Sequence, residues 1–418
     1  MNIFFSGIGG VGVGPLAEIA RDAGYNVMGS DLEVGLMTKK LQAEGINVHI
    51  GPQDGSFLQK AHEQQAIDWF VYTPALKDDH PEFLLAKKLG VKTAKRGELL
   101  AHIIQEKQLK LIAVSGTHGK TTTTGMLIWT LQQLGIPVSY SIGTTISFGP
   151  SGHYDPSSEY FVYECDEFDR NFLLFTPYIS LISSVDYDHP DTYPTKDEYT
   201  SAFRQFIHQS KATVLWQKDA EYLETKETNA WALQEDEVLG LALPGEHNRR
   251  NGTLVLKVLE RLHLGENNDN RLALESFPGT DRRFEKLADN LYSDYGHHPV
   301  EIAATLQLAR EVSQHVVLVY QPHQNVRQHE LRGEYIDQFE LADTIYWLPT
   351  YLSREDPDLP ILDPQQLVQT INNKDDIHEA TMNDELWQHI QDARRDGALV
   401  LCMGAGTIDG WVRKKLTD

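Results

Sequence analysis

The chain has 418 residues, of which 41% are hydrophobic and 23% charged, and its 37 basic and 60 acidic residues give a formal net charge of −23 at pH 7. This composition is typical of a folded globular protein and argues against a disordered chain. The negative charge argues against broad attraction to nucleic acid or to an anionic membrane. At roughly 150 residues per domain, we expect two or three domains.

Targeting and redox signals are few. The N-terminus lacks a basic segment followed by a long apolar one, and no window approaches the ~18–20 apolar residues of a membrane span. The two cysteines, Cys165 and Cys402, argue against a disulfide-dense scaffold and a cysteine-rich zinc site. We therefore expect a cytoplasmic protein without a signal peptide.

Residues 2–31 have the pattern of a strand, a glycine loop, a helix and a second strand. Apolar residues predict a further strand at 69–72 and a helix at 82–89. These elements predict a first α/β domain over residues 1–105.

The same pattern begins again after residue 110. A strand is expected at 111–114, a helix at 126–134, and further strands at 160–163 and 179–182. Alternating strands and helices favour a mostly parallel sheet, here in a central domain over residues 106–280. Within it, the polar stretch 265–270 is interpreted as a surface loop.

Two more apolar strands, at 316–320 and 398–403, predict a third α/β domain over residues 281–418. No short repeat, heptad or low-complexity tract is present. The predicted fold class is therefore α/β, with three domains and mostly parallel sheets.

The first glycine loop follows a strand and precedes a helix. Gly7, Gly9 and Gly12 have the spacing of a dinucleotide-binding loop, and Asp31 stands where an acidic residue would meet a ribose. Backbone amides and the helix N-terminus would hold a diphosphate. The alternative is a tight turn that only packs the helix on the strand, and the motif does not identify the base.

The second glycine loop, residues 116–122, carries a stronger signal. It combines glycines, a lysine for the β- and γ-phosphates and hydroxyls for Mg²⁺ just before a helix. Val114 stands where the full P-loop pattern has its first glycine, so this loop is a shortened variant. The alternative is a threonine-rich helix start.

Acidic residues follow two strands of the central domain, at 164–169 and at 186–189. If both strand ends lie beside the P-loop, Glu164 and His189 could coordinate Mg²⁺. Histidine is an unusual Mg²⁺ ligand, and each cluster taken alone is equally compatible with a solvated turn.

Four further polar segments have two interpretations each. The asparagines of 244–251 suit a helix cap or a purine edge, and the arginines of 281–284 suit phosphates or interdomain ion pairs. The histidines of 293–299 and 321–327 suit packing or a substrate. Adjacent His297 and His298 would point to opposite sides of an extended chain, which argues against a shared zinc site.

Taken in order, these segments resemble the Mur ligase family, and within it the branch that joins L-alanine to UDP-N-acetylmuramate. The resemblance spans the whole chain. The segments that carry it are 7–10, 116–122, 164–169, 188–189, 247–251, 282–284, 295–299, 321–323 and 404–406.

The resemblance implies an N-terminal Rossmann-like domain for the UDP portion, a central P-loop ATPase-type domain and a C-terminal Rossmann-like domain for the amino acid. It implies ATP and Mg²⁺ as cofactors, an acyl-phosphate intermediate, and UDP-N-acetylmuramate and L-alanine as substrates in cell-wall synthesis. A nicotinamide cofactor is then not expected. We expect no nucleic-acid or membrane partner, and a monomer or weak homodimer.

The resemblance also assigns roles to residues. Catalytic roles fall to Lys120, Glu164, His189, Arg283 and His297, and metal binding to Thr121, Glu164 and His189. The residues expected at ATP are Gly116, Thr117, His118, Gly119, Lys120, Thr121, Thr122, His247, Asn248, Asn251, Arg282 and Asp294. The residues expected at the other substrates are Gly7, Gly9, Gly10, Gly12, Asp31, Tyr295, His323 and Arg327.

Three positions depart from the family pattern. Ser184 replaces the usual asparagine, Gln324 the usual arginine after Gln-Pro-His, and Ser293 a frequent aspartate. The changes at 293 and 324 leave open a ligase that adds a preformed peptide to the same sugar nucleotide. Two other classes remain as alternatives, a P-loop nucleotide switch and an NAD(P)-dependent oxidoreductase. Both are disfavoured, because a switch would need only the second glycine loop and an oxidoreductase only the first.

Overall fold

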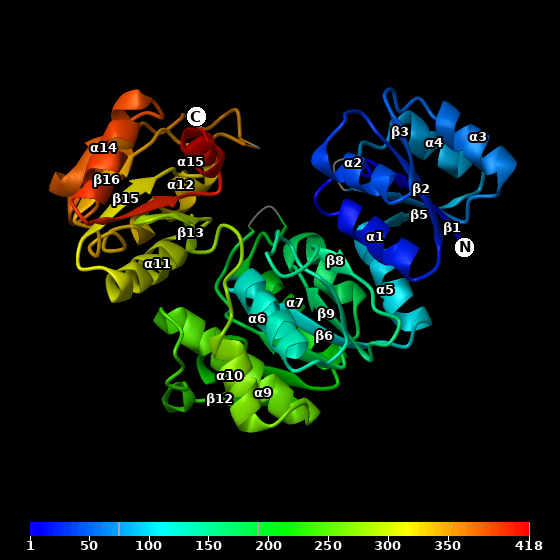
Figure 1. Ribbon diagram of the computed structural model, residues 1–418, viewed down its shortest axis with the longest axis horizontal. Coiled ribbons are helices and arrows are strands. Elements are labelled where there is room, and N and C mark those ends of the chain that lie inside the picture. The colour runs from blue at the N-terminus through cyan, green and yellow to red at the C-terminus, as the bar shows by residue number, and fades with distance from the viewer. Residues whose placement is uncertain (74–75, 190–191, 354, 418) are drawn as a thin grey trace. The chain divides into compact units, whose positions relative to one another are not determined.

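The computed structural model describes residues 1–73, 76–189, 192–353 and 355–417. It contains three α/β domains, each with its own, largely parallel sheet (Figure 1). By compactness the chain divides into two units: the first consists of residues 1–238 and 252–277, and the second of residues 239–251 and 278–418. The first two sheets belong to the first unit and the third to the second unit. The predicted α/β class with three domains is confirmed.

The N-terminal domain has a five-stranded parallel sheet in the order β3-β2-β1-β4-β5. The middle of its central strand is apolar, as expected for a strand covered on both faces, and Ile3, Phe4 and Phe5 are fully buried. The elements are β1 (Asn2–Ser6), α1 (Gly14–Asp22), β2 (Asn26–Asp31), α2 (Leu36–Ala43), β3 (Asn47–Ile50), α3 (Ser56–Gln64), β4 (Trp69–Tyr72), α4 (Pro81–Lys88), β5 (Lys92–Lys95) and α5 (Arg96–Glu106).

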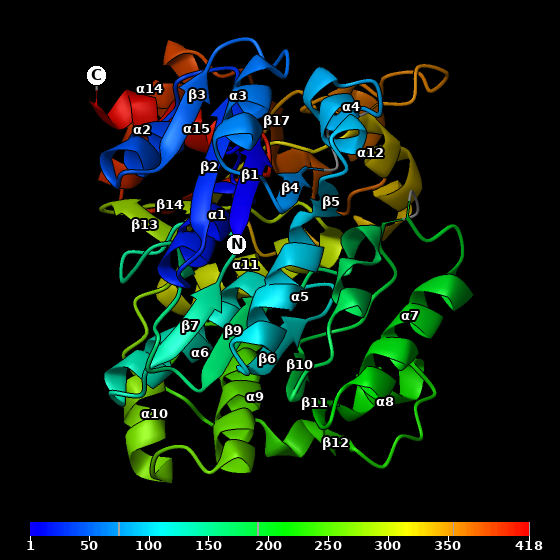
Figure 2. The same cartoon turned by 90° about the vertical axis from the view of Figure 1, so that its right-hand side faces the viewer.

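The central domain has a seven-stranded sheet in the order β12-β11-β10-β6-β9-β7-β8, in which only β8 is antiparallel to its neighbour (Figure 2). Strand β6 therefore lies between β9 and β10. The elements are β6 (Lys110–Ser115), α6 (Lys120–Gln133), β7 (Val138–Ser141), β8 (Gly152–His153), β9 (Tyr160–Glu164), the 3-10 segment η1 (Phe168–Leu174), β10 (Ile179–Ile182), α7 (Lys196–Gln209), β11 (Thr213–Trp216), α8 (Gln217–Tyr222), β12 (Ala230–Leu233), η2 (Glu235–Glu237), α9 (Glu246–Leu262) and α10 (Asn267–Glu275).

The prediction of a surface loop over residues 265–270 is right in part: residues 265–269 are exposed, but α10 begins at Asn267, so most of the stretch is helical. Asn270 is 2% exposed, and its amide donates to the Leu264 carbonyl at 2.8 Å. Leu274 is fully buried, and the Trp129 indole donates to the Ala273 carbonyl at 3.1 Å. Packing against α6 thus makes a helix of a polar sequence that suggests a loop by composition.

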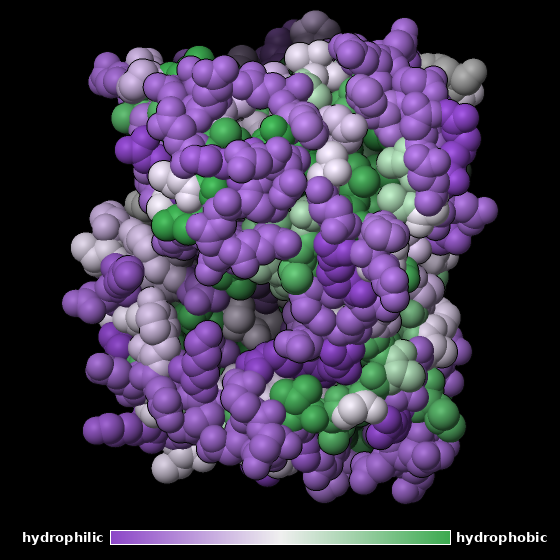
Figure 3. All heavy atoms as spheres, turned by 90° about the vertical axis from the view of Figure 1, so that its left-hand side faces the viewer, coloured by the Kyte–Doolittle hydropathy of each residue, from purple (hydrophilic) through white to green (hydrophobic). Residues whose placement is uncertain are grey.

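One continuous cluster of buried side chains joins the two domains of the first unit. It includes Leu99 and Ile103 of α5 together with Phe172 and Phe175 of the central domain. The face of the molecule in Figure 3 carries mainly hydrophilic residues, with hydrophobic ones in separate groups. Among the residues described, no helix has both the length and the apolar character that crossing a membrane requires.

The second unit has a six-stranded sheet in the order β13-β14-β18-β15-β16-β17, parallel except between β13 and β14. Residues 239–251, which include the first turn of α9, belong to this unit. The other elements are β13 (Glu285–Ala288), β14 (Leu291–Asp294), α11 (Pro299–Val312), β15 (Val316–Tyr320), α12 (Asn325–Leu331), η3 (Arg332–Glu334), β16 (Thr344–Trp347), α13 (Pro364–Val368), η4 (Lys374–Asp376), β17 (Ile377–Glu379), α14 (Asp384–Arg395), β18 (Leu399–Met403) and α15 (Ile408–Thr417).

A bidentate ion pair between Arg249 and Glu311 holds residues 245–249 against α11. Both oxygens of Glu311 accept hydrogen bonds from the Arg249 guanidinium, at 2.7 and 2.8 Å, and the Gly245 amide donates to the same carboxylate at 2.9 Å. The hydrogen bonds from Arg249, the largest cause, lower the pKa of Glu311 to about 2. This carboxylate thus stabilises the folded state when it is ionised.

We expect Glu311→Gln to lower the free energy of unfolding by about 1 kcal/mol at pH 7, since the pair is partly exposed and screened. Because the pKa is depressed in the folded state, the stabilisation is present above the ordinary glutamate pKa of about 4.3 and is lost as the pH falls toward 2. Urea unfolding at pH 7 and near pH 3.5 should show the difference from the unmodified protein shrinking. A difference in unfolding free energy that stays the same at both pH values would contradict the assigned role of Glu311. Glu63→Gln, at an exposed position of α3, serves as the control.

Candidate functional site

The first glycine loop connects β1 to α1 and is held by the end of β2. The amides of Gly7 and Ile8 both donate to the Ser30 carbonyl, at 2.9 and 3.0 Å. The Gly9 amide donates to Oδ2 of Asp31 at 2.8 Å. Asp31 therefore fixes the loop that it was predicted to accompany, and its contact with a ribose stays a prediction.

The second glycine loop, residues 116–122, connects β6 to α6. The sheet register pairs Val114 with Glu164 of β9 and Ser115 with Ile182 of β10. The segments that follow β9 and β10 therefore begin on either side of this loop. The structure thus meets the condition set for the magnesium hypothesis, that both strand ends lie beside the P-loop.

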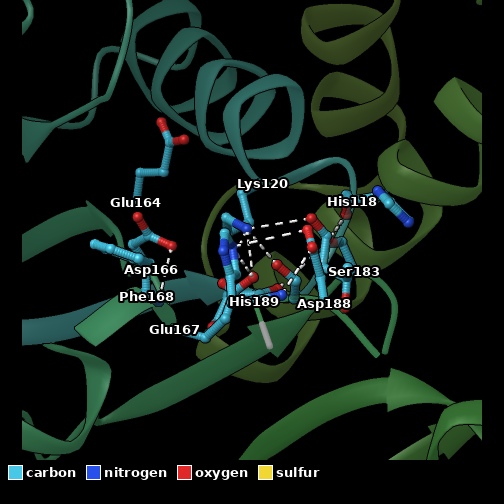
Figure 4. A network of polar contacts seen from close by, with 12 residues as sticks. His118, Lys120, Glu164, Asp166, Glu167, Phe168, Ser183, Asp188 and His189 are labelled. Atoms are coloured by element: carbon cyan, nitrogen blue, oxygen red, sulfur yellow. Dashed lines mark hydrogen bonds and ion pairs between the residues drawn. The ribbon is translucent and has the colours of Figure 1, made fainter. Parts of the chain in front are cut away.

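Lys120, at the start of α6, is held in place by carbonyl and carboxylate oxygens (Figure 4). Its Nζ donates to the Gly116 carbonyl at 2.6 Å and lies 2.9 Å from Oε2 of Glu167, whose side chain is fully buried. Burial alone would lower the pKa of Lys120, but the Glu167 carboxylate and its acidic neighbours outweigh burial and raise it. The lysine is therefore a fixed positive charge in the loop.

Potential metal ligands lie next to Lys120 in two groups, all of them oxygens except the imidazole nitrogen of His189. The Thr121 hydroxyl donates to Oε1 of Glu164 at 2.6 Å, and the Gly143 amide donates to Oε2 of Glu164 at 2.7 Å. One ligand atom each from Asp166, Glu167 and His189 lies within 4.8 Å of the others. Carboxylate and hydroxyl oxygens are the donors that Mg²⁺ prefers, so these residues fit a magnesium site.

The P-loop is tied to the segment after β10. The His118 amide donates to the Ser184 hydroxyl at 3.0 Å, and the Ser183 hydroxyl donates to the Ser115 carbonyl at 3.2 Å. The Thr117 hydroxyl donates to the Asp186 carbonyl at 2.7 Å. Ser184, which replaces the usual asparagine, thus still binds the loop directly, and Thr122 lies in the first turn of α6.

In the second unit, the Asp294 carboxylate holds the backbone of the segment that contains Arg282 and Arg283. Its carboxylate accepts hydrogen bonds from the amides of Phe284 and Gly296, both at 2.7 Å. Burial raises the pKa of Asp294 to about 6, although Arg283 and the two amides lower it. The guanidinium carbons of Arg282 and Arg283 lie 4.6 and 5.2 Å from the centre of the Tyr295 ring.

The predicted histidines of the second unit lie near these residues. The His297 ring lies 5.6 Å from that of Tyr295 and 5.4 Å from that of His323, and burial lowers the pKa of His297 to about 3. The charge of Arg327 contributes to the same lowering. His297 is thus neutral at pH 7, and an uncharged imidazole can donate and accept hydrogen bonds.

The start of α9 contributes His247, Asn248 and Asn251 to the second unit. Burial lowers the pKa of His247 to about 4, and the charge of Arg283 is among the smaller causes. The Asn248 amide donates to the Pro244 carbonyl at 2.9 Å, and Asn251 is 6% exposed. The purine contact predicted for the two asparagines stays a prediction.

Three family models match the chain: "Mur ligase family, catalytic domain" over residues 2–108, "Mur ligase middle domain" over 114–238, and "Mur ligase, glutamate ligase domain" over 282–406. Together they cover most of the sequence. The chain belongs to the Mur ligase family. Both glycine loops and the acidic residues beside the P-loop lie in matched segments.

Curated relatives and solved structures agree with this family. The UDP-N-acetylmuramate–L-alanine ligase of Gloeobacter violaceus is 31% identical over 97% of this chain and 93% of that protein. The UDP-N-acetylmuramate–alanine ligase of Thermotoga maritima is 25% identical with a TM-score of 0.78, covering 100% of this chain and 98% of that one. A murein peptide ligase of Psychrobacter arcticus, 22% identical with a TM-score of 0.63 and the same coverage, shares the fold.

The sequence did not single out every residue of the P-loop cluster. Asp166 and Glu167 belong to the acidic segment 164–169, but the sequence alone does not say which of its carboxylates pairs with Lys120. The turn after β9 decides this: Asp169 and Arg170 adopt positive φ there. The Tyr193 hydroxyl, which donates to the Glu167 carbonyl at 2.6 Å, further fixes that turn.

Gly116 offers a direct test of the P-loop geometry. Its φ is +130°, and a Cβ there would lie 2.6 Å from the Ser183 hydroxyl and 2.7 Å from the Ser184 carbonyl. We expect Gly116→Ala to cost about 1–3 kcal/mol of stability and to weaken ATP binding at least about tenfold, because the loop must move.

Thermal unfolding and calorimetric titration with ATP measure both effects. Gly135→Ala is the matched control, since Gly135 also has positive φ, at +68°, but no atom lies within 4 Å of its Cβ position. ATP affinity lost equally in both variants, or in neither, would contradict the assignment of the loop to ATP.

Proposed function

We propose that the protein is an ATP-dependent ligase that joins L-alanine to UDP-N-acetylmuramate in peptidoglycan synthesis. The observation that carries the proposal is the grouping of Lys120, Thr121 and Glu164 at the ends of β6 and β9, in a chain similar over nearly its whole length to ligases of that name. The first glycine loop supplies a second anion site in the same unit, which suits a diphosphate.

The reaction proposed has two steps. A carboxylate oxygen of the lactyl group attacks the γ-phosphorus of ATP, and ADP leaves, so that an acyl phosphate forms. The amine of L-alanine then attacks the acyl carbon, loses a proton, and expels inorganic phosphate to leave an amide. Such phosphoryl transfer depends mainly on positioning and on neutralising developing negative charge.

The residues of the first unit divide this work. Lys120 would exchange its contact with Glu167 for phosphate oxygens and carry the positive charge that the transition state needs. The loop of residues 116–122, with the N-terminus of α6, would hold the phosphates of ATP. Gly7, Gly9, Gly10 and Gly12 would line the site of the sugar nucleotide's diphosphate. Thr121, Glu164 and His189 would hold Mg²⁺, with Asp166 and Glu167 nearby; when bound, Mg²⁺ neutralises phosphate charge and orients the γ-phosphoryl group.

The residues of the second unit would serve the nucleoside and the amino acid. We assign His247, Asn248, Asn251, Arg282 and Asp294 to ATP. Arg283, Tyr295, His297, His323 and Arg327 are assigned to the acyl phosphate and the amine. Neutral His297 is suited to accept the proton that the attacking amine loses.

The direct experiment measures ADP formation with each substrate omitted in turn. We expect ADP only when ATP, Mg²⁺, UDP-N-acetylmuramate and L-alanine are all present. Equal turnover without the sugar nucleotide or without the amino acid would indicate a nucleotide switch. Reduction of added NAD(P) would indicate an oxidoreductase.

A second candidate acceptor is a preformed peptide, and Gln324 is the observation that favours it. Gln324 stands where an arginine is usual, adopts a φ of +61°, and donates its amide to the Ser353 carbonyl at 3.1 Å. This replacement removes a positive charge from the predicted acceptor side. Comparing free amino acids with a short peptide beginning in L-alanine at equal concentration separates the candidates. We further propose a cytoplasmic monomer or weak homodimer.

A further inference from the structure

Arg96 lies beside the first glycine loop although it is distant from it in sequence. It is the first residue of α5, directly after β5, and the sheet order places β5 next to β4 and β4 next to β1. Because β1, β4 and β5 are parallel, their carboxyl ends lie along one edge of the sheet. The loop that follows β1 and the start of α5 therefore share that edge.

The Arg96 side chain extends across Gly12. A Cβ on Gly12 would lie 2.1 Å from Nη1 of Arg96 and 3.6 Å from its Cδ. The φ of Gly12 is outside the left-handed range, so the backbone at this position would accept any residue. A side chain at this position would have to displace the guanidinium, which occupies the space that a Cβ would fill.

The guanidinium is not paired with any carboxylate of residues 1–73, 76–189, 192–353 and 355–417. Among the residues that the structure describes, Arg96 makes no hydrogen bond or ion pair through its side chain, although acidic residues outnumber basic ones by 60 to 37. The charge of Arg96 still reaches Asp166. Burial raises the pKa of Asp166, several positive charges and a backbone hydrogen bond lower it, and Arg96 is among the smaller of these lowering causes. A partly buried arginine without a bonded anion beside a loop of amides is suited to an external anion.

The start of α5 is fixed by the central domain. The neighbouring Lys95 forms an ion pair with Asp169 at 2.6 Å, and a Cβ on Gly97 would lie 2.1 Å from the side-chain oxygen of Asn171. Arg96 thus projects from a backbone that both domains of the first unit hold in place.

We propose that Arg96 binds the diphosphate of the sugar nucleotide at the first glycine loop. The inference rests on the proposed function and adds a residue to its first substrate site. The planar guanidinium can donate two hydrogen bonds to phosphate oxygens, and the N-terminus of α1, which follows the loop, favours the same negative charge.

The experiment compares ligands with and without the diphosphate. Calorimetry gives the affinities of UDP and UDP-N-acetylmuramate, and ligand-observed NMR gives that of uridine, for the unmodified protein and for Arg96→Gln. We expect UDP and UDP-N-acetylmuramate to bind about 10- to 100-fold more weakly to the variant, because a charge-assisted bond is lost. The affinities for uridine and for a non-hydrolysable ATP analogue should be unchanged. Arg21→Gln, which removes a charge from α1 in the same domain, should leave all four unchanged.

A second variant tests the contact itself. Gly12→Ala should displace the guanidinium and weaken UDP binding, and adding Arg96→Gln to it should weaken binding little further. Fully additive losses, or UDP bound equally well by Arg96→Gln, would overturn the role of Arg96. If the unmodified protein fails to bind UDP-N-acetylmuramate at all, the proposed function fails instead, so the two failures are distinguishable.

Discussion

Replacing Lys120 with alanine is expected to lower kcat for ADP formation by about 10³-fold or more, the largest effect of any single substitution in this chain. The lysine is the fixed positive charge of the P-loop, within 2.6 Å of the Gly116 carbonyl and 2.9 Å of Glu167. Removing a preorganised charge at a phosphoryl-transfer site costs about 10²–10³-fold or more, because the negative charge that develops in the transition state loses a fixed positive partner. Steady-state assays of ADP release measure the loss.

The control must separate chemistry from folding, because Lys120→Ala leaves Glu167 buried without its partner. An isolated buried charge is strongly destabilising. The double variant Lys120→Met/Glu167→Gln removes both charges, so it should recover thermal stability while remaining inactive. Recovery of activity together with stability would show that Lys120 has only a structural role.

Replacing Glu164 with glutamine is expected to raise the Mg²⁺ concentration for half-maximal activity and to lower kcat, each by about 100-fold. Thr121 and Gly143 now donate to Oε1 and Oε2 of Glu164, at 2.6 and 2.7 Å. The glutamine amide keeps one of these two oxygens as an acceptor and removes the negative charge that a divalent cation needs. Titrating Mg²⁺ at saturating ATP measures the shift.

Glu159→Gln is the matched control for Glu164. It lies at the other end of the same strand, where its carboxylate pairs with Lys110 on the surface. Its variant should keep the Mg²⁺ requirement of the unmodified protein. An unchanged Mg²⁺ requirement in Glu164→Gln would exclude Glu164 as a metal ligand.

Apolar runs and glycine spacing predicted the architecture of the sheets. The strands containing residues 3–5, 111–114 and 316–320 are buried, and buried parallel strands are apolar throughout, so their sequences are informative on their own. The two glycine loops were predictable for a similar reason, because a phosphate-binding turn restricts both residue type and spacing. The proximity of Glu164 to the P-loop was only a condition of the magnesium hypothesis, and the strand order of the structure meets it.

Contacts between distant segments were not predictable from local patterns. The pairing of Lys120 with Glu167 depends on a turn with positive φ at Asp169, and the α10 helix depends on packing against α6. Arg96 gives no local signal, since it looks like an ordinary first residue of a helix. Only the sheet order brings it to Gly12.

The central claim is that ATP activates the lactyl carboxylate as an acyl phosphate, which the amine then attacks. It is tested most directly with UDP-N-acetylmuramate carrying ¹⁸O in both carboxylate oxygens. Mass spectrometry of the inorganic phosphate formed with ATP and L-alanine should find one ¹⁸O atom per phosphate, with the other retained in the amide. Unlabelled phosphate formed at the same rate as the amide would contradict the account.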